Sequence, residues 1–395
     1  MENIERRLEE ESDCFKGVCE MKYKWAVFAV SAAFLVLVLS SSSEAVDTKG
    51  IDICCHKDVL DSEDLQIIDN FVAEAVQELV ATHDFTSIAR IRTVILSRSS
   101  SSKESAAGQY SSQFSESAHK YISEAFEAAE ELAPEERKFK MILNLLILVD
   151  SLEDLQLADL ATRMINDENK AIRYWAVHSV TNRGFMEQLN ATEGAKLKAG
   201  SLVEELKKLV DSSGPEILAL MVEFAAGVDT PAGEGLLVQI ADRRIKEYAD
   251  WTVEYELLDG TILKSLDSKI PSGGLINSVV ARRFGQLYSY VMQRYVEGRD
   301  FLSAAEKHQL ASVLVEIEML CISKRLGMGQ SIIKKAVERG DYMAVLEEHN
   351  RLLGDETRAG QLPLKLNFDY GKNPDGSKRV APLSLPEPPK IEGAG

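Results

Sequence analysis

Helical periodicity is the feature that most limits what this chain can fold into. Apolar residues recur at intervals of three and four along nearly all of it from Asp61 to Leu353, and this spacing places them on one face of an α-helix. No stretch alternates apolar and polar residues as a half-buried strand does, and neither Asp259-Gly260 nor Asp375-Gly376 lies between two such stretches. The sequence therefore predicts an all-α protein.

The composition supports a folded protein and argues against one class of ligand. Of 395 residues, 45% are hydrophobic and 27% are charged, which is enough apolar material for a core. The 63 acidic residues outnumber the 45 basic ones, which gives a net charge of −18. Nucleic-acid binders need a basic surface. Arg282-Arg283, a small basic candidate, is expected to be a solvated helix face, and no nucleic-acid partner is predicted.

The N-terminal part of the fold is expected to be a helical region at 46–150 with one interruption. Asp61-Ser62 caps a helix, and Pro134 begins another with two glutamates in its first turn. Between these helices, 10 of the 21 residues at 97–117 are Ser. A stretch of this composition has little to bury, so we expect it to be a loop or a frayed helix.

The window from Ser151 to Arg183 is the most informative part of the chain. It contains a short apolar stripe, an acidic turn and a second stripe; these residues are Leu155, Ala158, Leu160, Ile165, then Asp167, then Ile172, Arg173, Trp175, Ala176, Ser179 and Val180. The pattern resembles a HEAT repeat, the two-helix unit of α-solenoids, in which an acidic turn precedes an aliphatic-Arg pair and a small residue. The resemblance covers about 30 residues.

The resemblance implies a particular set of contacts. In HEAT proteins the Arg and the turn Asp tend to form a ladder between repeats, which here implicates Arg173 and Asp167. A small residue at Ala176 lets neighbouring helices approach closely. We also expect Trp175 to lie in a packed interface, so that Trp175→Asp would unfold this repeat.

Further helical pairs follow at similar steps. Leu202 lies 47 positions after Leu155, and Leu236 lies 34 positions after Leu202, which suits helical repeats that bury their apolar faces by stacking. We therefore predict a short HEAT- or armadillo-like solenoid at 151–270 with extra helices at both ends. The segment at 250–270 is expected to be two short helices or an irregular crossover. A break follows, and 271–355 is expected to form a C-terminal helical bundle or cap.

The first 45 residues are expected to lie outside the fold. Fifteen residues at Trp25–Leu39 include a single polar one, and two lysines precede them. This length suits a secretory signal peptide better than a membrane span of about 20 residues. Ser43 and Ala45 place small residues before a cleavage site at Val46. We predict export to the periplasm or the medium; an uncleaved N-terminal anchor is the alternative, and Met21 is a possible true start.

The C-terminal residues 356–395 change character. Six of the ten prolines of the chain lie after position 360, and few apolar residues accompany them. The predicted structure is a disordered, extended tail. The alternative is a polyproline ligand for a groove on a partner.

Three cysteines follow the expected cleavage site: Cys54, Cys55 and Cys321. Cys321 continues an apolar helical stripe and is expected to be a core residue. Cys54-Cys55 precedes His56, but adjacent residues rarely point at one metal ion and no second ligand group has zinc spacing. No metal site is therefore predicted. A disulfide from the Cys54-Cys55 pair to a partner chain or to Cys321 is the better interpretation.

Catalytic signatures are missing from the sequence. It has no G-x-S-x-G elbow, no Walker loop and no H-E-x-x-H motif, and Gly327-Met328-Gly329 is half a dinucleotide motif that follows a helix. No catalytic or cofactor-binding residue is therefore assigned and no cofactor is predicted. His178 lies four residues after Tyr174 and is the one histidine considered for a cleft, although a packed role is favoured.

An aromatic stripe later in the chain has two interpretations. Phe284, Tyr288 and Tyr295, together with Arg294, have the composition of an interface. Their helical spacing favours a core instead.

These observations favour a non-catalytic function. We predict an exported helical-repeat scaffold or adaptor that presents a helical surface to a protein partner, by analogy with other solenoids. One alternative is a secreted or envelope enzyme with carboxylates and His178 in a helical cleft. Another is a structural component that self-assembles.

Overall fold

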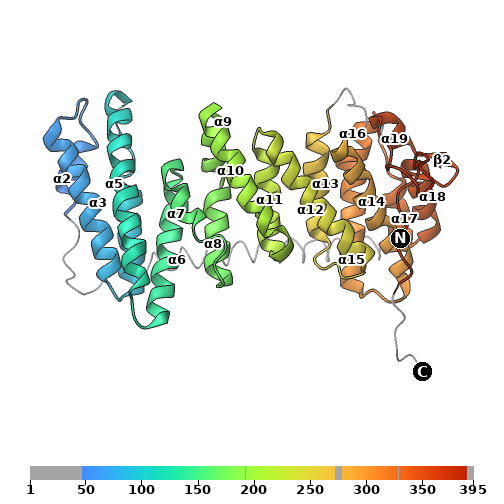
Figure 1. Ribbon diagram of the computed structural model, residues 1–395, viewed down its shortest axis with the longest axis horizontal. Coiled ribbons are helices and arrows are strands. Elements are labelled where there is room, and N and C mark those ends of the chain that lie inside the picture. The colour runs from blue at the N-terminus through green and yellow to red at the C-terminus, as the bar shows by residue number, and fades with distance from the viewer. Residues whose placement is uncertain (1–46, 103, 192, 272–277, 328, 389–395) are drawn as a thin grey trace, which may run out of the picture. The chain divides into compact units, whose positions relative to one another are not determined.

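The computed structural model describes residues 47–388 except 103, 192, 272–277 and 328, and most of these residues are helical. Helices from residues far apart in the sequence do not intermix; each packs on its near neighbours, in a row from α2 to α19 (Figure 1). Two layers of helices run along this row.

The first layer begins near the N-terminus and ends near residue 353. Its helices are α3 (Ser62–Ala81), α5 (Glu104–Glu130), α7 (Ala158–Thr162), α10 (Glu193–Leu209), α12 (Pro231–Ala249), α14 (Val279–Glu297) and α18 (Tyr342–Leu353). The second layer alternates with it along the chain up to α15, and α17 then follows α15 in the same layer. Its helices are α4 (Phe85–Leu96), α6 (Glu135–Leu152), α8 (Lys170–Thr181), α11 (Pro215–Gly227), α13 (Leu257–Lys269), α15 (Ala304–Ile317) and α17 (Ile332–Arg339).

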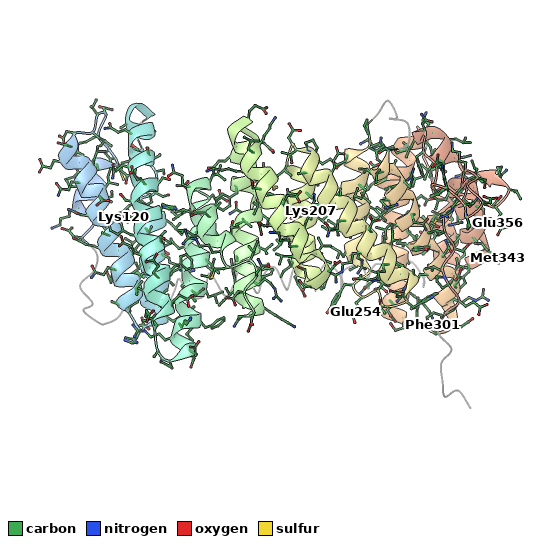
Figure 2. All side chains as sticks on the ribbon, viewed as in Figure 1. Lys120, Lys207, Glu254, Phe301, Met343 and Glu356 are labelled. Atoms are coloured by element: carbon green, nitrogen blue, oxygen red, sulfur yellow. The ribbon has the colours of Figure 1, made fainter. Side chains whose placement is uncertain are left out.

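Shorter elements connect or cap the two layers. They are α2 (Lys49–Cys54), the 3-10 turns η1 (Leu155–Leu157), η2 (Val210–Ser212) and η3 (Gly298–Asp300), α9 (Arg183–Ala191), the π-helical turn η4 (Glu318–Ile322), α16 (Ser323–Leu326), β1 (Gly354–Asp355), β2 (Arg358–Ala359) and α19 (Gln361–Leu366). The two strands form a hairpin of two antiparallel residue pairs. Figure 2 adds the side chains to the ribbon.

The packing identifies the fold as a helical-repeat solenoid, as predicted. Within the second layer α4 contacts α6, and the contacts continue in order through α8, α11, α13 and α15 to α17. The first layer is continuous in the same way, except that η1 and α9 carry the contacts on either side of α7. Each amphipathic helix buries its apolar stripe only because its neighbours cover it. The stacking runs from α3 to α18 without a break at the expected boundaries 150 and 270.

Capping residues set many helix starts. Asp61 forms a capping box with Asp64 at the start of α3, and Ser303 forms one with Glu306 at the start of α15. Pro215 and Pro231 occupy the first turns of α11 and α12, where a missing N–H costs nothing. The expected helix starts at Asp61-Ser62 and after Pro134 are confirmed.

The Ser-rich segment is mostly helix, which corrects the expected loop at 97–117. The turn there ends by residue 102, and α5 begins at Glu104 and continues for 27 residues. Its buried side chains recur every three or four residues on one face: Ala106, Tyr110, Phe114, Ala118, Ile122, Ala125, Phe126 and Ala129. The serine content obscured this helical spacing of apolar residues, because most of the serines occupy the other positions of an amphipathic helix.

The segment at 250–270 contains one regular helix, α13, and not two. The residues before it form an irregular turn in which Trp251 and Tyr255 have φ angles of 57° and 56°. Non-glycine residues rarely adopt this left-handed region. The turn is the irregular part of the expected crossover.

The tail also needs correction, because residues 356–388 pack against the solenoid. Apolar side chains are buried near its start and near its end: Leu362, Leu366, Phe368, Tyr370 and Leu385. Gly285 of α14 makes room for them, since a Cβ there would lie 2.9 Å from Cζ of Phe368. The composition suggested too few apolar residues for a core, but these few complete an existing one. Residues 389–395, the expected signal segment 1–45 and Val46 lie outside the described residues.

One further property concerns membranes. Within the described ranges, no helix has the length and apolar content that a bilayer span requires.

Candidate protein-binding groove

A single short helix interrupts the first layer of the solenoid. Helix α7 has 5 residues and follows a 3-residue turn, whereas α5 has 27 residues and α10 has 17. The chain before it turns sharply, since Glu153 ends α6 in the left-handed conformation and Asp154 accepts a hydrogen bond from the Gln156 amide to begin η1. The layer therefore lacks material where a full helix would lie. Figure 2 labels Lys120 on α5 and Lys207 on α10, on the two sides of this position.

An open groove of about 1130 Å³ occupies this gap. Its apolar lining comes from η1, α7, α9 and α10, namely Leu155, Ala158, Leu189, Leu197 and Leu202. Leu197 is 77% exposed although it belongs to this apolar set. Large apolar side chains that line an open groove are typical of surfaces that bind another protein.

Charged side chains of both signs border the groove. Asp159 contacts Nε2 of His119 at 3.2 Å and Nη2 of Arg163 at 3.3 Å, and Lys198 and Glu205 come from α10. These side chains lie near solvent, so each pair contributes little to stability. They are placed to orient a bound partner, as the polar rim of an interface does.

A second, smaller cavity of about 460 Å³ contacts the same turn, and Gln156 lines both. Its lining combines apolar side chains such as Phe114 and Leu152 with polar ones that include five serines: Ser99, Ser100, Ser111, Ser112 and Ser115. The Oγ atom of Ser115 is buried and has no hydrogen-bond partner in the described residues. The Ser-rich segment thus contributes polar side chains to a cavity, both from the turn before α5 and from α5 itself.

The short turn is held in place by Gln188 of α9. The Leu155 amide donates to Oε1 of Gln188 at 3.1 Å, and Nε2 of Gln188 donates to the carbonyls of Glu153 and Gly184. One side-chain amide therefore satisfies the backbone at the end of α6 and at the start of η1. This fixes the position of α7 and keeps the groove open.

The HEAT-like signature lies in the loop before α8 and in α8 itself. Ile172, Ala176 and Val180 are buried between the layers, as the stripe predicted. Arg173 does not form the implied ladder with a neighbouring repeat: Nη1 donates to the backbone carbonyl of Asp167 at 3.0 Å, within the same turn. The carboxylate of Asp167 instead accepts from the Asn169 amide at 2.7 Å.

Trp175 is not in the packed interface that the stripe predicted. It is half-buried and forms an aromatic cluster with its neighbours, with ring centroids 5.9 Å from Tyr174 and 5.2 Å from His178. A helical stripe about 100° wide has edges, and Trp175 lies at one of them. Trp175→Asp would therefore place its charge at a half-buried edge of the stripe, and its effect on folding stays a prediction.

His178 is a packed residue with one carboxylate partner. Its Nδ1 lies 2.8 Å from Oδ1 of Asp150, and Nδ2 of Asn182 donates to the same carboxylate at 3.2 Å. The hydrogen bond to Asp150 raises the pKa of His178, against the opposing effect of burial. His178 lines neither cavity.

Cys54 and Cys55 do not form the expected disulfide with Cys321, and the alternative disulfide to a partner chain stays a prediction. Cys54, Cys55 and Cys321 are all free and buried. Sγ of Cys54 faces Asp64 and Sγ of Cys55 donates to the Tyr110 hydroxyl at 3.0 Å, so the adjacent thiols point at different elements. Burial raises the pKa of Cys54 to about 11 and that of Cys321 to about 12, which makes both unreactive.

No cluster of three or more His, Cys, Asp or Glu side chains within the described ranges has a geometry that would hold a metal ion. Nδ1 of His56 lies 2.7 Å from the Asp52 carbonyl oxygen.

The aromatic stripe of α14 is core and not an exposed patch. Phe284, Tyr288 and Tyr295 are at most 5% exposed, and Arg294 is buried beside Glu256. Arg282 and Arg283 each have an acidic partner, Asp369 and Asp242 respectively. The small basic patch is thus neutralised.

No protein-family model and no curated protein matches the chain. Among solved structures, the crystal structure of Kap121p is similar with 14% identity and a TM-score of 0.34, over 82% of this chain and 36% of that one. The chain therefore spans about a third of the length of Kap121p. A similarity at this level does not indicate a shared function or partner.

Proposed function

We propose that this protein is a non-catalytic helical-repeat scaffold that binds a partner protein in the groove beside α7. The observation that carries this proposal is the short α7 between two long helices, which leaves an apolar-lined groove open in an otherwise continuous layer. An amphipathic helix of the partner fits this gap, because it would supply the turns that α7 lacks. Binding of a helix in a groove is a common mode of peptide recognition.

The side chains that line the groove indicate the chemistry expected of the partner helix. Leu197 and the half-buried Leu155 present apolar surface to the apolar face of such a helix, and Leu202 lies buried at the base of the groove. Arg163 and Lys198 on the rim suit acidic residues at the edge of that face, and Asp159 and Glu205 suit basic ones. The partner helix is therefore expected to be apolar on one face and mixed in charge at its borders.

Site-specific photocrosslinking tests this proposal. A photoreactive amino acid at position 197 should crosslink one stoichiometric partner in the native cell, through a segment with helical apolar spacing. The matched control is position 364, since Leu364 is 71% exposed on α19 and lies far from α7 in the sequence. Leu155→Asp should remove the crosslink at 197. Equal crosslinking at 197 and 364 would argue against the groove.

We further propose that the protein acts after export. The support is the apolar segment Trp25–Leu39 with small residues before Val46. The intact mass of the protein purified from its own cell should correspond to a start near Val46. A mass that begins at Met1 or Met21 would contradict cleavage.

The enzyme alternative has less support, because His178 lines neither cavity and its carboxylate partner is also bonded to Asn182. Self-assembly remains a separate hypothesis. It predicts a mass in sedimentation experiments that rises with concentration and that Leu197→Asp lowers.

A further inference from the structure

The most specific contact between distant parts of the chain lies on α14, well away from the groove. There the extended residues 382–386 lie along the helix, and two glutamines bond their backbone. The Leu383 amide donates to Oε1 of Gln286 at 2.8 Å, and Nε2 of Gln286 donates to the Leu383 carbonyl at 3.2 Å. Nε2 of Gln293 donates to the same carbonyl at 3.1 Å, and the Leu385 amide donates to Oε1 of Gln293 at 2.7 Å.

We call Gln286 and Gln293 the amide clamp. They lie seven residues apart on α14 and are 5% and 6% exposed, so both face the same extended segment from within the fold. Nε1 of Trp251 adds a fifth hydrogen bond, to the Pro386 carbonyl at 3.0 Å. All five bonds involve the backbone of the segment and none involves its side chains.

The side chains of the segment divide into buried and exposed sets. Pro382 is buried and Leu385 is 7% exposed, whereas Ser384 is exposed and Leu383 is 44% exposed. Recognition thus combines backbone hydrogen bonds with two apolar anchors, as in other sites for extended peptides. The neighbouring prolines favour the extended conformation before binding.

The clamp is held by residues that do not belong to the tail. Nε2 of Gln293 also donates to Oγ of Ser289 at 2.7 Å, and that hydroxyl lies 2.8 Å from Nε2 of His349 on α18. Trp251 is positioned by the ring of Phe301, with centroids 5.2 Å apart, and by Arg294 at 5.4 Å. Figure 2 places Phe301 at the same end of the helices as Glu254, close to Trp251 in the chain. These supporting contacts all come from outside the segment, so the solenoid itself positions the clamp and Trp251.

We propose that this face of α14 is a binding site for an extended Pro-Leu-x-Leu-Pro segment of a partner protein, and that the chain's own residues 382–386 occupy it in the free state. The charge-neutral clamp and the five backbone bonds specify an extended peptide and not a helix or an ion. The site requires N–H groups at the positions of Leu383 and Leu385, so proline is excluded there. The tail acts as an intramolecular competitor, whose effective concentration a partner must overcome.

The test uses the full-length chain with the tail released. Leu385→Asp places a charge at the main apolar anchor and should free the site. The probe is a fluorescein-labelled peptide with the sequence of residues 380–388, and binding is followed by anisotropy. We expect Leu385→Asp protein to bind the probe at least about 10-fold tighter than the wild type, a difference of about 1.4 kcal/mol.

Two controls identify the contacts. Adding Gln286→Ala and Gln293→Ala to the released chain should weaken probe binding at least about 10-fold, because each loses a paired donor and acceptor. A probe N-methylated at Leu385 should lose affinity in the same way, whereas N-methylation at the exposed Ser384 should have a smaller effect.

Three results of these experiments would contradict the proposal. A released chain with an unchanged melting temperature that does not bind the probe would overturn it. If Leu385→Asp does not fold, a chain with Gly-Ser residues at 382–386 replaces it; failure of both to fold makes the segment a structural part of the solenoid and also overturns the proposal. A wild-type dimer that Gln286→Ala and Gln293→Ala abolish would assign the site to a second copy, against the partner proposed here.

Discussion

The first layer of the solenoid is open at α7 and closed at α14, and the two regions differ in what covers the helix. Around α7 the neighbouring helices of the first layer leave a groove that is lined by an exposed leucine, Leu197. Around α14, 15 of the 19 residues are buried, because α12, α18 and the tail surround the helix. Stacking alone therefore does not fix which surfaces of a solenoid are free. Which surfaces are free also depends on the length of each helix and on where the C-terminal segment packs.

The charges of the two regions follow the same division. Near α14, Arg244 pairs with Asp259 at 2.8 Å while both are at most 4% exposed, and Tyr248 donates to the same carboxylate at 2.7 Å. Near α7, Asp159 and Arg163 are each more than half exposed. Buried pairs fix one arrangement of the helices, whereas exposed pairs leave the surface free to bind. Four predictions test this contrast.

The largest effect is expected from breaking the buried pair of the closed region. Asp259→Ala leaves the Arg244 guanidinium buried without its main partner. Burial alone would lower the pKa of Arg244, but the Asp259 carboxylate raises it, so the guanidinium is charged in the folded protein. Removal of the carboxylate leaves this buried charge unpaired, which destabilises the fold. We expect a loss of about 3–5 kcal/mol in the free energy of unfolding, measured with denaturant. Asp300→Asn, at an exposed side chain, is the control and should change stability by less than about 0.5 kcal/mol.

The second prediction compares two leucines beside the groove. Leu160 of α7 is 1% exposed and Leu197 of α10 is 77% exposed. Leu160→Ala should cost about 2–5 kcal/mol because it leaves a cavity, and Leu197→Ala should cost less than about 0.5 kcal/mol. Equal losses in denaturant unfolding would mean that Leu197 is covered, and the open region would no longer differ from the closed one.

The third prediction uses two glycines within helices. A Cβ at Gly285 of α14 would lie 2.9 Å from Phe368 and 3.1 Å from the Tyr370 hydroxyl, whereas nothing lies within 4 Å of a Cβ at Gly200 of α10. Gly285→Ala should lose about 1–3 kcal/mol through overpacking. Gly200→Ala should gain about 0.4–1 kcal/mol, because alanine restricts the unfolded chain. Thermal melts of the two variants should shift in opposite directions.

The sequence predicted the second layer well and the covering of the first layer poorly. The stripe Ile172, Ala176 and Val180 is buried as expected, because local periodicity determines which face of α8 turns inward. Coverage of α14 depends on Phe368 and Leu385, which come from a proline-rich segment. A composition average cannot show that a few apolar residues fit an existing surface.

The groove also could not be predicted from the sequence, although the sequence contained one signal for it. The stripe from Leu155 to Ile165 was short for a helix, and a short member of a layer leaves a gap. What the sequence does not contain is the length of the neighbours on each side, since the Ser-rich start of α5 concealed a 27-residue helix. The aromatic cluster of Trp175 was missed for a related reason: an edge position of a stripe has the same spacing as a central one.

The smallest expected effect concerns the boundary of the open region, where His178 pairs with Asp150. The pKa of His178 is raised above its ordinary value of about 6.5, so the charged pair stabilises the fold below that pH and the contribution is lost as the pH rises through the raised pKa. Because the His178 side chain is a third exposed, the effect should stay below about 1 kcal/mol. The stability difference between the wild type and His178→Gln should therefore be larger at acidic pH than at alkaline pH. A difference that instead grows with pH would show that the neutral imidazole is the form this repeat needs, and that Asp150 and the nearby Glu223 do not act on it as charges.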